Sequence, residues 1–322
     1  MVMAQALFLL LKQRQPERAV DVVAPGWSRP LLDRMPEVRQ SWSLDVGHGQ
    51  LGLGRRLQLG RQLRGRYREA IVLPNSYKAA LLPFHARIAK RTGFLGELRW
   101  GLLNDIRPLD KQALPRTVDR FLALGLPARE PLPATLPIPH LTVDRPAALA
   151  TLGRWMTEEG TPLLALCPGA EYGPAKRWPA ERFAELASRM IKRGWRVLVC
   201  GSAKEQALGA EIATAAGPAA LNLAGQTSLD EAVEILSLAT WVVSNDSGLM
   251  HVAAALDRPV IALFGSSDPH HTPPLGNRTQ VISLGLPCAP CFRRSCPEQH
   301  LNCLTGIGVE QVLARMDELS SP

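Results

Sequence analysis

The sequence predicts an α/β protein made of two Rossmann-like domains that face a central cleft. Its 322 residues exceed the roughly 100–200 residues of a typical single domain. Short apolar segments alternate with amphipathic segments of helical length, a pattern typical of parallel strands covered by helices on both faces. A proline-rich stretch divides this alternation into two halves.

The first half of the chain shows the weaker form of the alternation. A helix is expected at the very start, closed by Pro16, although an α/β chain more often begins with a strand. The apolar runs AVDVVA and AIVL predict strands, and the second of these ends at a Pro-Asn-Ser turn. The elements expected here are helix Val2–Arg14, strand Ala19–Ala24, helix Trp27–Arg34, a strand within Val38–Val46, basic helix Leu51–Arg66, strand Ala70–Leu73, helix Tyr77–Lys90 and a helix near Arg116–Leu124.

Six prolines between residues 126 and 146 mark the boundary between the domains. Each proline removes a backbone donor and disfavours helix at the residue before it, so a linker is expected. We place this linker at about residues 126–145, an N-terminal domain at residues 1–145 and a C-terminal domain at residues 146–322.

The second half alternates more regularly, and most of its strands are almost wholly apolar. A parallel sheet of this kind binds ligands at the carboxyl ends of its strands, where helix N-termini present backbone N–H groups. The expected elements are strands Leu163–Cys167, Arg196–Cys200, Ala220–Leu223, Trp241–Ser244 and Val260–Phe264, and helices Ala180–Arg193, Lys204–Ala216, Leu229–Ala239 and Gly248–Leu256.

The formal net charge of +8 is concentrated in one part of the chain. Residues 50–100 hold nine arginines and two lysines against only Glu69 and Glu97. Such a surplus favours an acidic partner: a nucleotide, a phosphorylated glycan, an anionic membrane surface or a nucleic acid. No nucleic-acid-binding module accompanies it, so we expect no nucleic-acid partner, and a merely solvated helix face stays an alternative.

The cysteines and the apolar N-terminal segment indicate the cellular compartment of the protein. Six cysteines in a long chain without a secretion signal indicate a reducing compartment. The segment Met1–Leu11 is shorter than the ~20 apolar residues of a membrane span. It also lacks the cationic start and the cleavage site of a signal peptide. We therefore expect a cytoplasmic protein whose contact with a membrane is at most peripheral.

The strongest candidate binding site is Ser244–His251, which follows an apolar strand and opens a helix. Ser247 and Gly248 can leave bare N–H groups facing an anion, and the helix dipole favours negative charge there. Ser247 and His251 share a helix face because they are four residues apart. This arrangement suits a nucleotide sugar, with amides for the diphosphate and polar side chains for sugar hydroxyls. The alternative is a plain N-cap by Asp246 or Ser247 beside a packed histidine.

Three further strand-to-helix turns lie at the same expected edge. A small-residue turn at Gly169 and Ala170 lets backbone approach a ligand and Lys176 adds a cation, unless this is only a loop with a solvated lysine. Glu205 either accepts hydrogen bonds from a ribose or satisfies the helix dipole as a first-turn glutamate. The residues Phe264–Pro269 either line the cleft or only form the turn after the strand.

Two other patterns are less specific. Gly47–Gly52 matches G-x-G-x-x-G, but the preceding segment is polar and no tight βαβ unit surrounds it, so no dinucleotide site is assigned. Cys288, Cys291, Cys296 and Cys303 could bind zinc, although their spacing is not two C-x-x-C pairs. Reduced structural thiols, or a disulfide formed during handling, are the alternatives. We assign no metal site.

Several of these segments together resemble the lipopolysaccharide heptosyltransferases of glycosyltransferase family 9, in particular the heptosyltransferase II branch. The resemblance covers essentially the whole chain. The LPNSYK and cysteine segments are specific to this branch, whereas Asp-Ser-Gly-x-x-His is shared more widely in the family. The segments that carry the resemblance are LPNSYK (73–78), RTGF (91–94), GLLNDIRPLD (101–110), CPGAEYGPAKRWP (167–179), SNDSGLMHVAAALDRPVIALFGSSDP (244–269) and LPCAPCFRRSCPEQHLNCL (286–304).

The resemblance implies a GT-B fold with an acceptor-binding N-terminal domain and a C-terminal domain that binds ADP-heptose. It implies inverting transfer of L-glycero-D-manno-heptose to the first heptose of the inner core, on heptosyl-Kdo2-lipid A, without a metal or other cofactor. Peripheral contact with the inner membrane is expected for an enzyme with such an acceptor.

Residue roles follow from the same resemblance, motif by motif. The donor-binding residues that it implies are Gly169, Ala170 and Lys176 at the phosphates, Asp246, Ser247, Gly248, Leu249 and His251 at the diphosphate and sugar, and Glu205 and Thr227 near the adenosine. The acceptor-side candidates are Asn75, Ser76 and Lys78.

The start of the chain departs from the family's pattern. Relatives begin with a strand and a glycine-rich turn ending in Gly-Asp, just before the segment equivalent to Met1–Gln5, and that Asp is the family's proposed general base. We therefore expect a misassigned start or an N-terminal truncation, with the first strand of the N-terminal domain absent and no catalytic residue assignable in this numbering. Loss of a general base typically costs ~10²–10⁴-fold in rate, so an impaired ADP-sugar-binding remnant stays an alternative to an active transferase.

Overall fold

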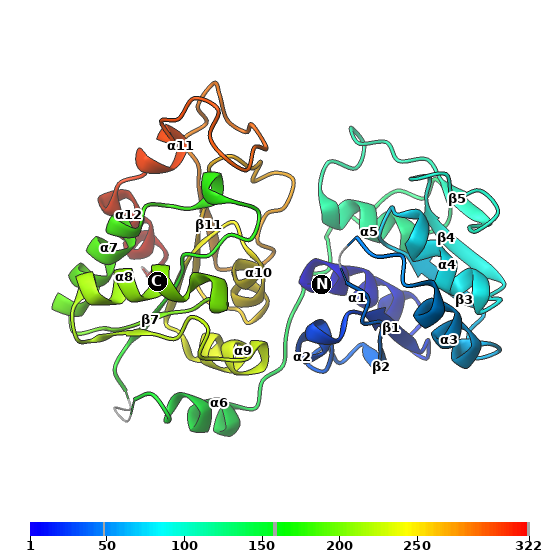
Figure 1. Ribbon diagram of the computed structural model, residues 1–322, viewed down its shortest axis with the longest axis horizontal. Helices are drawn as coiled ribbons and strands as arrows, with labels where there is room; N and C mark the ends of the chain where they lie inside the picture. The colour runs from blue at the N-terminus through cyan, green and yellow to red at the C-terminus, as the bar shows by residue number, and fades with distance from the viewer. Residues whose placement is uncertain (48, 157–159, 321–322) are drawn as a thin grey trace. The chain divides into compact units, whose positions relative to one another are not determined.

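The computed structural model describes residues 1–47, 49–156 and 160–320 of the protein. All pairings between its described strands are parallel, which confirms the predicted α/β class. The chain folds as two compact units, Met3–Pro137 and Ile138–Pro322, which are described in turn (Figure 1).

The second unit is built on one six-stranded parallel sheet, with the strand order β11-β10-β9-β6-β7-β8. Every residue of β6, β9 and β10 is buried, as expected for inner strands that are covered on both faces. The strands are β6 (Leu163–Cys167), β7 (Arg196–Val199), β8 (Ala220–Asn222), β9 (Trp241–Asn245), β10 (Val260–Leu263) and β11 (Thr279–Ile282).

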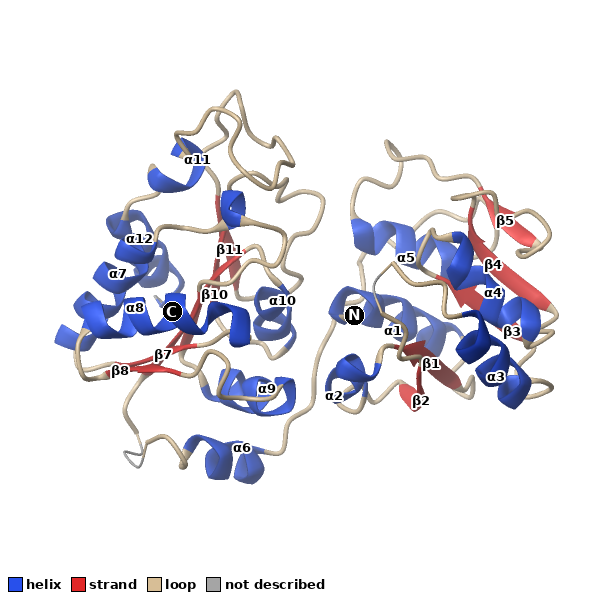
Figure 2. Cartoon of the chain, in the orientation of Figure 1, coloured by secondary structure: helices blue, strands red, loops and turns tan. Residues whose placement is uncertain are grey.

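Helices cover both faces of this sheet. Figure 2 shows α7, α8 and α12 on one side of the strands and α9 and α10 on the other. One core lies on the α7 side, where Trp178 and Phe183 pack edge to face with each other among apolar strand residues. The helices are α6 (Arg145–Leu152), α7 (Ala180–Lys192), α8 (Gln206–Ala216), α9 (Leu229–Leu238), α10 (Gly248–Ala255), α11 (Asn302–Thr305) and α12 (Val309–Ser320).

The first unit carries its strands in two parallel sheets instead of one continuous sheet. Strand β1 (Val20–Ala24) pairs with β2 (Val38–Ser43), and β3 (Glu69–Val72) pairs with β4 (Lys90–Phe94), which in turn pairs with β5 (Asp105–Arg107). Residues of β1 and β3 that would be covered inside a continuous sheet are therefore only partly buried.

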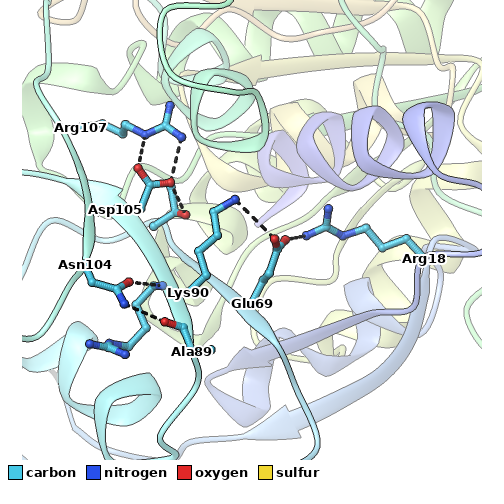
Figure 3. Close-up of polar contacts among 9 residues, drawn as sticks. Arg18, Glu69, Ala89, Lys90, Asn104, Asp105 and Arg107 are labelled. Carbon is cyan, nitrogen blue, oxygen red and sulfur yellow. Dashed lines mark hydrogen bonds and ion pairs between the residues drawn. The ribbon is translucent and has the colours of Figure 1, made fainter.

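Charged side chains link the starts of these strands (Figure 3). Arg18, just before β1, donates to Glu69 at the start of β3 over 2.5 Å, and Lys90 at the start of β4 lies 3.4 Å from the same carboxylate. Within β5, the Arg107 guanidinium donates two hydrogen bonds to the Asp105 carboxylate, over 2.6 and 2.9 Å. The network thus ties the two sheets together at one end.

Helices accompany the strands of the first unit. Helices α1 and α5 pack together so closely that a Cβ added at Gly125 would lie 2.4 Å from Cδ1 of Leu7. The helices are α1 (Gln5–Arg14), α2 (Arg29–Leu32), α3 (Leu53–Leu63), α4 (Tyr77–His85) and α5 (Thr117–Gly125). None of the described helices of either unit combines the length and the apolar character that a membrane span requires.

The predicted helix Tyr77–Lys90 is wrong at its C-terminal end. The helix stops at His85, and Arg87 adopts a left-handed backbone with φ of 55° that an α-helix cannot continue through. Lys90–Phe94 then forms β4, which the sequence analysis missed because the segment is largely polar. Thr92 is nevertheless buried, because it lies in the middle strand of the sheet and donates to Asp105 over 2.9 Å.

Other elements were absent from the sequence prediction. Strands β5 and β11 are short and half-polar, and α11 and α12 lie beyond the last predicted strand. Helix α6 begins where the linker was expected to end, with Pro146 in its first turn, a position where the missing N–H of proline costs nothing.

Candidate functional site

The carboxyl end of β9 leads directly into the N-terminus of α10 and leaves that helix end open. Ser247 is the N-cap residue, but its side chain makes no capping bond, and its Oγ instead lies 3.2 Å from Oγ of Ser244. Gly248 is exposed, and a Cβ added there would meet no atom within 4 Å. The first turn of α10 therefore lacks a side-chain cap, which leaves backbone N–H groups for an anion.

Asp246 joins three loops at this helix mouth. Nζ of Lys176, from the loop after β6, donates to Oδ2 of Asp246 over 2.5 Å. Oγ of Ser267, from the turn after β10, donates to the same oxygen over 2.6 Å. The carboxylate is only 8% exposed, so these contacts fix both loops beside the start of α10. Lys176 and the Ser247 turn, far apart in sequence, thus lie at one place.

Asn245 fixes the loop that carries Lys176, and sequence reasoning missed its role. Its side chain is fully buried, donates to the backbone oxygen of Pro168 over 2.7 Å and accepts the backbone N–H of Trp178 over 3.0 Å. The two bonds bracket residues 168–178 at both ends. A buried amide at the end of an apolar strand was the available signal, because such a group must find partners.

His251 lies on α10 one turn after Ser247. Burial lowers the pKa of His251 from its usual 6.5 to about 4, against the opposing effect of the Asp246 carboxylate. The ring is therefore neutral near pH 7, able to donate and accept one hydrogen bond each.

This shift predicts a pH dependence of stability. The unfolded chain binds the His251 proton more tightly, so the contribution of the neutral ring is complete above pH 6.5 and is lost as the pH falls to about 4. We expect roughly 2 kcal/mol over this window, since one pKa unit corresponds to about 1.4 kcal/mol and the ring keeps some exposure. Denaturant unfolding of wild type and His251→Asn at several pH values measures it; parallel profiles for the two proteins would contradict the assignment.

Gly169 and Glu205 lie against each other at the ends of β6 and β7. A Cβ added at Gly169 would come within 2.9 Å of Cγ of Glu205, so only glycine fits this approach. Oε2 of Glu205 accepts the backbone N–H and the hydroxyl of Ser202 in a capping box, and Oε1 lies 3.8 Å from Arg177. Glu205 thus makes capping contacts in the first turn of its helix, and its binding of a ribose stays a prediction.

The remaining donor-side candidates contribute less directly. Ala170 is buried, so only its backbone can meet a ligand. Leu249 is half-buried in the first turn of α10. Thr227 lies in the turn before α9, which packs on the β7 turn through the Gly225 N–H bond to the Gly201 oxygen over 3.0 Å. No contact of the Thr227 side chain with the other candidates is seen among the described residues.

The acceptor-side candidates belong to the first unit, at the turn between β3 and α4. The backbone oxygen of Asn75 accepts from Glu97 N–H over 3.2 Å, Ser76 is the N-cap of α4, and Lys78 donates to the Gln50 oxygen over 3.4 Å. Fully buried Arg99 donates to the oxygen of Pro74 over 2.7 Å and so shapes this turn.

The structure also locates the G-x-G-x-x-G segment and the cysteines. Gly52 caps α3 with φ of 56°, whereas His48 of the same motif lies outside the described residues. All six cysteines are free thiols, and no metal-binding group of His, Cys, Asp or Glu is present among the described side chains. Burial raises the pKa of the Cys303 thiol, and the nearby thiols of Cys288, Cys296 and Cys291 raise it further.

Comparison with known proteins identifies the family of the chain. The family model of glycosyltransferase family 9 (heptosyltransferase) matches residues 56–302. Lipopolysaccharide heptosyltransferase 2 of Escherichia coli K12 is 44% identical over 99% of this chain and 94% of its own length. Its counterpart in Salmonella typhimurium LT2 is 48% identical over 88% of this chain and 84% of its own length.

Solved structures give the same result for the fold. The structure of E. coli ADP-heptose lps heptosyltransferase II superposes with a TM-score of 0.88 at 42% identity, covering 99% of this chain and 94% of that one. This likeness confirms the GT-B fold that the sequence resemblance implied.

Proposed function

Since the chain belongs to glycosyltransferase family 9 and is a heptosyltransferase of lipopolysaccharide core synthesis, we propose that it transfers L-glycero-D-manno-heptose from ADP-heptose to the first heptose of the inner core, with inversion. The observation that carries this proposal is the uncapped mouth of α10 beside Lys176. A diphosphate needs N–H donors and a cation at one place, and this mouth offers both.

The proposed chemistry is displacement at the anomeric carbon. The acceptor hydroxyl of heptosyl-Kdo2-lipid A attacks from the face opposite ADP and releases its proton to solvent. The sugar–phosphate bond breaks as the new glycosidic bond forms. Negative charge then grows on the leaving diphosphate, where the α10 N–H groups and Lys176 stabilise it more than in the bound donor. Ser247, Gly248, Leu249 and His251 line this mouth, while Glu205 and Thr227 lie at neighbouring turns for the adenosine.

A transfer assay combined with calorimetry tests the proposal. The protein is incubated with ADP-heptose and heptosyl-Kdo2-lipid A, and ADP binding is measured on the same preparation. ADP binding with heptose transfer supports the proposal. Failure to bind either ADP or ADP-heptose would remove the donor assignment altogether.

A second candidate is binding of an ADP-sugar without transfer. The separation of β1–β2 from β3–β4–β5 favours it, because Rossmann-like domains hold their catalytic loops on one continuous sheet. ADP binding of normal strength without detectable heptose transfer would support this candidate over the first.

We further propose that the first unit contacts the cytoplasmic face of the inner membrane peripherally. Leu98 and Trp100 are 73% and 60% exposed in the loop after β4, and that loop packs on the start of α4 through the Glu97 bond to the Tyr77 N–H over 2.8 Å. Exposed apolar and aromatic side chains within a basic segment suit an anionic bilayer. The acceptor-side candidates Asn75, Ser76 and Lys78 adjoin this corner.

Removal of this apolar corner should weaken membrane binding. We expect Leu98→Ser with Trp100→Ser to lower partition onto anionic phosphatidylglycerol vesicles roughly tenfold, because two apolar side chains no longer leave water. Phe84→Ser, at the far end of α4, is the matched control and should bind like wild type. Equal sedimentation of all three proteins with the vesicles would contradict the membrane proposal.

A further inference from the structure

The cysteine loop, residues 286–301, is attached to the loop that carries Lys176. The backbone N–H of Ala175 donates to the oxygen of Arg294 over 3.0 Å, and the Tyr172 hydroxyl donates to the oxygen of Phe292 over 2.6 Å. A Cβ added at Gly173 would lie 2.6 Å from the Arg294 oxygen, so glycine is needed where the two loops meet. The cysteine loop therefore sets the path of the chain just before Lys176.

The same loop also reaches the other side of the helix mouth. The Phe292 N–H donates to the oxygen of Ser266 over 2.7 Å, and the next residue, Ser267, donates to Asp246. Beneath this turn, Leu304 of α11 packs so closely that a Cβ at Gly265 would lie 2.5 Å from its Cγ. The cysteine loop is thus fixed to two of the loops that meet at Asp246.

Two cations of these loops approach one aromatic ring. The Arg294 guanidinium carbon lies 5.5 Å from the ring centroid of Tyr172, and Nζ of Lys176 lies 5.1 Å from the same centroid. Tyr172 remains 39% exposed, so this group faces solvent. A cation held over a ring keeps its N–H donors available for a ligand.

Charge pairing distinguishes Arg294 from its neighbours. Lys176 is paired with Asp246, and Arg177 lies 3.8 Å from Glu205. Lys204 is likewise paired with Glu171 over 2.6 Å. In the part of the chain that the structure describes, Arg294 has no carboxylate within ion-pair distance. The hydrogen bond from Lys204 lowers the pKa of Glu171, and the charge of Arg294 contributes further to this lowering. A diphosphate brings more than one negative charge to a mouth where Lys176 is paired with Asp246, so a further cation nearby adds attraction for the diphosphate.

We propose that Arg294 is a second diphosphate-binding cation of the donor site, held over Tyr172 beside Lys176. This inference rests on the proposed ADP-sugar binding and deepens it. The guanidinium offers paired N–H donors that match two phosphate oxygens, whereas Lys176 acts as a point charge. The cysteine segment then has a defined purpose, since its backbone positions Arg294 and the Lys176 loop together.

Calorimetric titration of ADP into four forms of the full chain tests this inference: wild type, Arg294→Gln, Arg294→Lys and Arg293→Gln. The adjacent Arg293 is also exposed and serves as the matched control. We expect Arg294→Gln to bind ADP at least about tenfold more weakly, the usual effect of losing a charged hydrogen bond. Arg294→Lys should recover part of the affinity, because it keeps the charge but not the paired donors, and Arg293→Gln should bind like wild type.

Two further readouts separate charge from loop structure. Affinity for ADP in wild type should fall more steeply with salt than in Arg294→Gln, because one ionic contact fewer remains to be screened. In the transfer assay, Arg294→Gln should raise the KM for the donor more than it lowers kcat. Equal ADP affinities for Arg294→Gln and Arg293→Gln would overturn the inference while wild-type ADP binding still upheld the proposed function. Equal losses in Arg294→Gln and Arg294→Lys would overturn it too, since charge would then be irrelevant.

Discussion

Lys176→Met is expected to lower kcat/KM for heptose transfer by about 10²–10³-fold, the usual effect of removing one group that stabilises transition-state charge. Nζ of Lys176 lies at the mouth of α10, where the leaving diphosphate is proposed to gain charge. The methionine keeps an unbranched apolar chain of nearly the same length and removes the cation. Steady-state kinetics with ADP-heptose measures the change.

The controls for Lys176→Met address the charge that it leaves behind. Asp246 is nearly buried and would keep Ser267 as its remaining side-chain donor, so the single variant should also lose some stability. The double variant with Asp246→Asn removes the unbalanced carboxylate and should recover the Tm but not the transfer rate. Lys204→Met, which removes an exposed lysine of the next turn, should transfer normally. Recovery of transfer in the double variant would show that Lys176 acts on stability alone.

Gly248→Asp is expected to weaken ADP binding about 100-fold relative to its neutral isostere Gly248→Asn, because like charges brought together at a desolvated contact cost several kcal/mol. The same change should leave the Tm equal or higher, since a carboxylate in the first turn of a helix stabilises it by about 0.3–1 kcal/mol. Space for either side chain exists, because a Cβ at Gly248 meets nothing within 4 Å.

The opposite signs of these two effects make the test specific. A variant that misfolds would lose both stability and ADP affinity, whereas an anion site at the helix mouth predicts a loss of affinity alone. Calorimetry with ADP and thermal unfolding are run on both Gly248 variants. Indistinguishable ADP affinities for the Asp and Asn variants would mean that no phosphate group approaches this end of α10.

The elements of the second unit could be predicted from the sequence because each is encoded by neighbouring residues. Strands such as Leu163–Cys167 and Val260–Leu263 are unbroken apolar runs, and a parallel sheet buries such runs on both faces. The turn from β9 into α10 was visible for the same reason, since an apolar strand, a polar turn and a helix follow one another directly. Their order alone places Ser247 and Gly248 at the sheet edge where ligands bind.

The features that escaped prediction depend on partners distant in sequence. Strand β4 looks polar, and its Thr92 is buried only because Asp105, thirteen residues later, accepts its hydroxyl. Asn245 and Ser267 matter through their bonds to the loop after β6 and to Asp246, which no spacing rule encodes. The approach of Arg294 to Tyr172 spans more than 100 residues and is visible only once the fold brings the loops together.

The central claim is that the start of α10 and Lys176 hold the diphosphate of an ADP-sugar. A crystal structure of the protein with ADP tests it most directly. We predict diphosphate oxygens within about 3.5 Å of Nζ of Lys176 and of the Gly248 and Leu249 N–H groups, the range of a hydrogen bond. ADP bound with its phosphates away from these groups, while Lys176 still contacts only Asp246, would contradict the account.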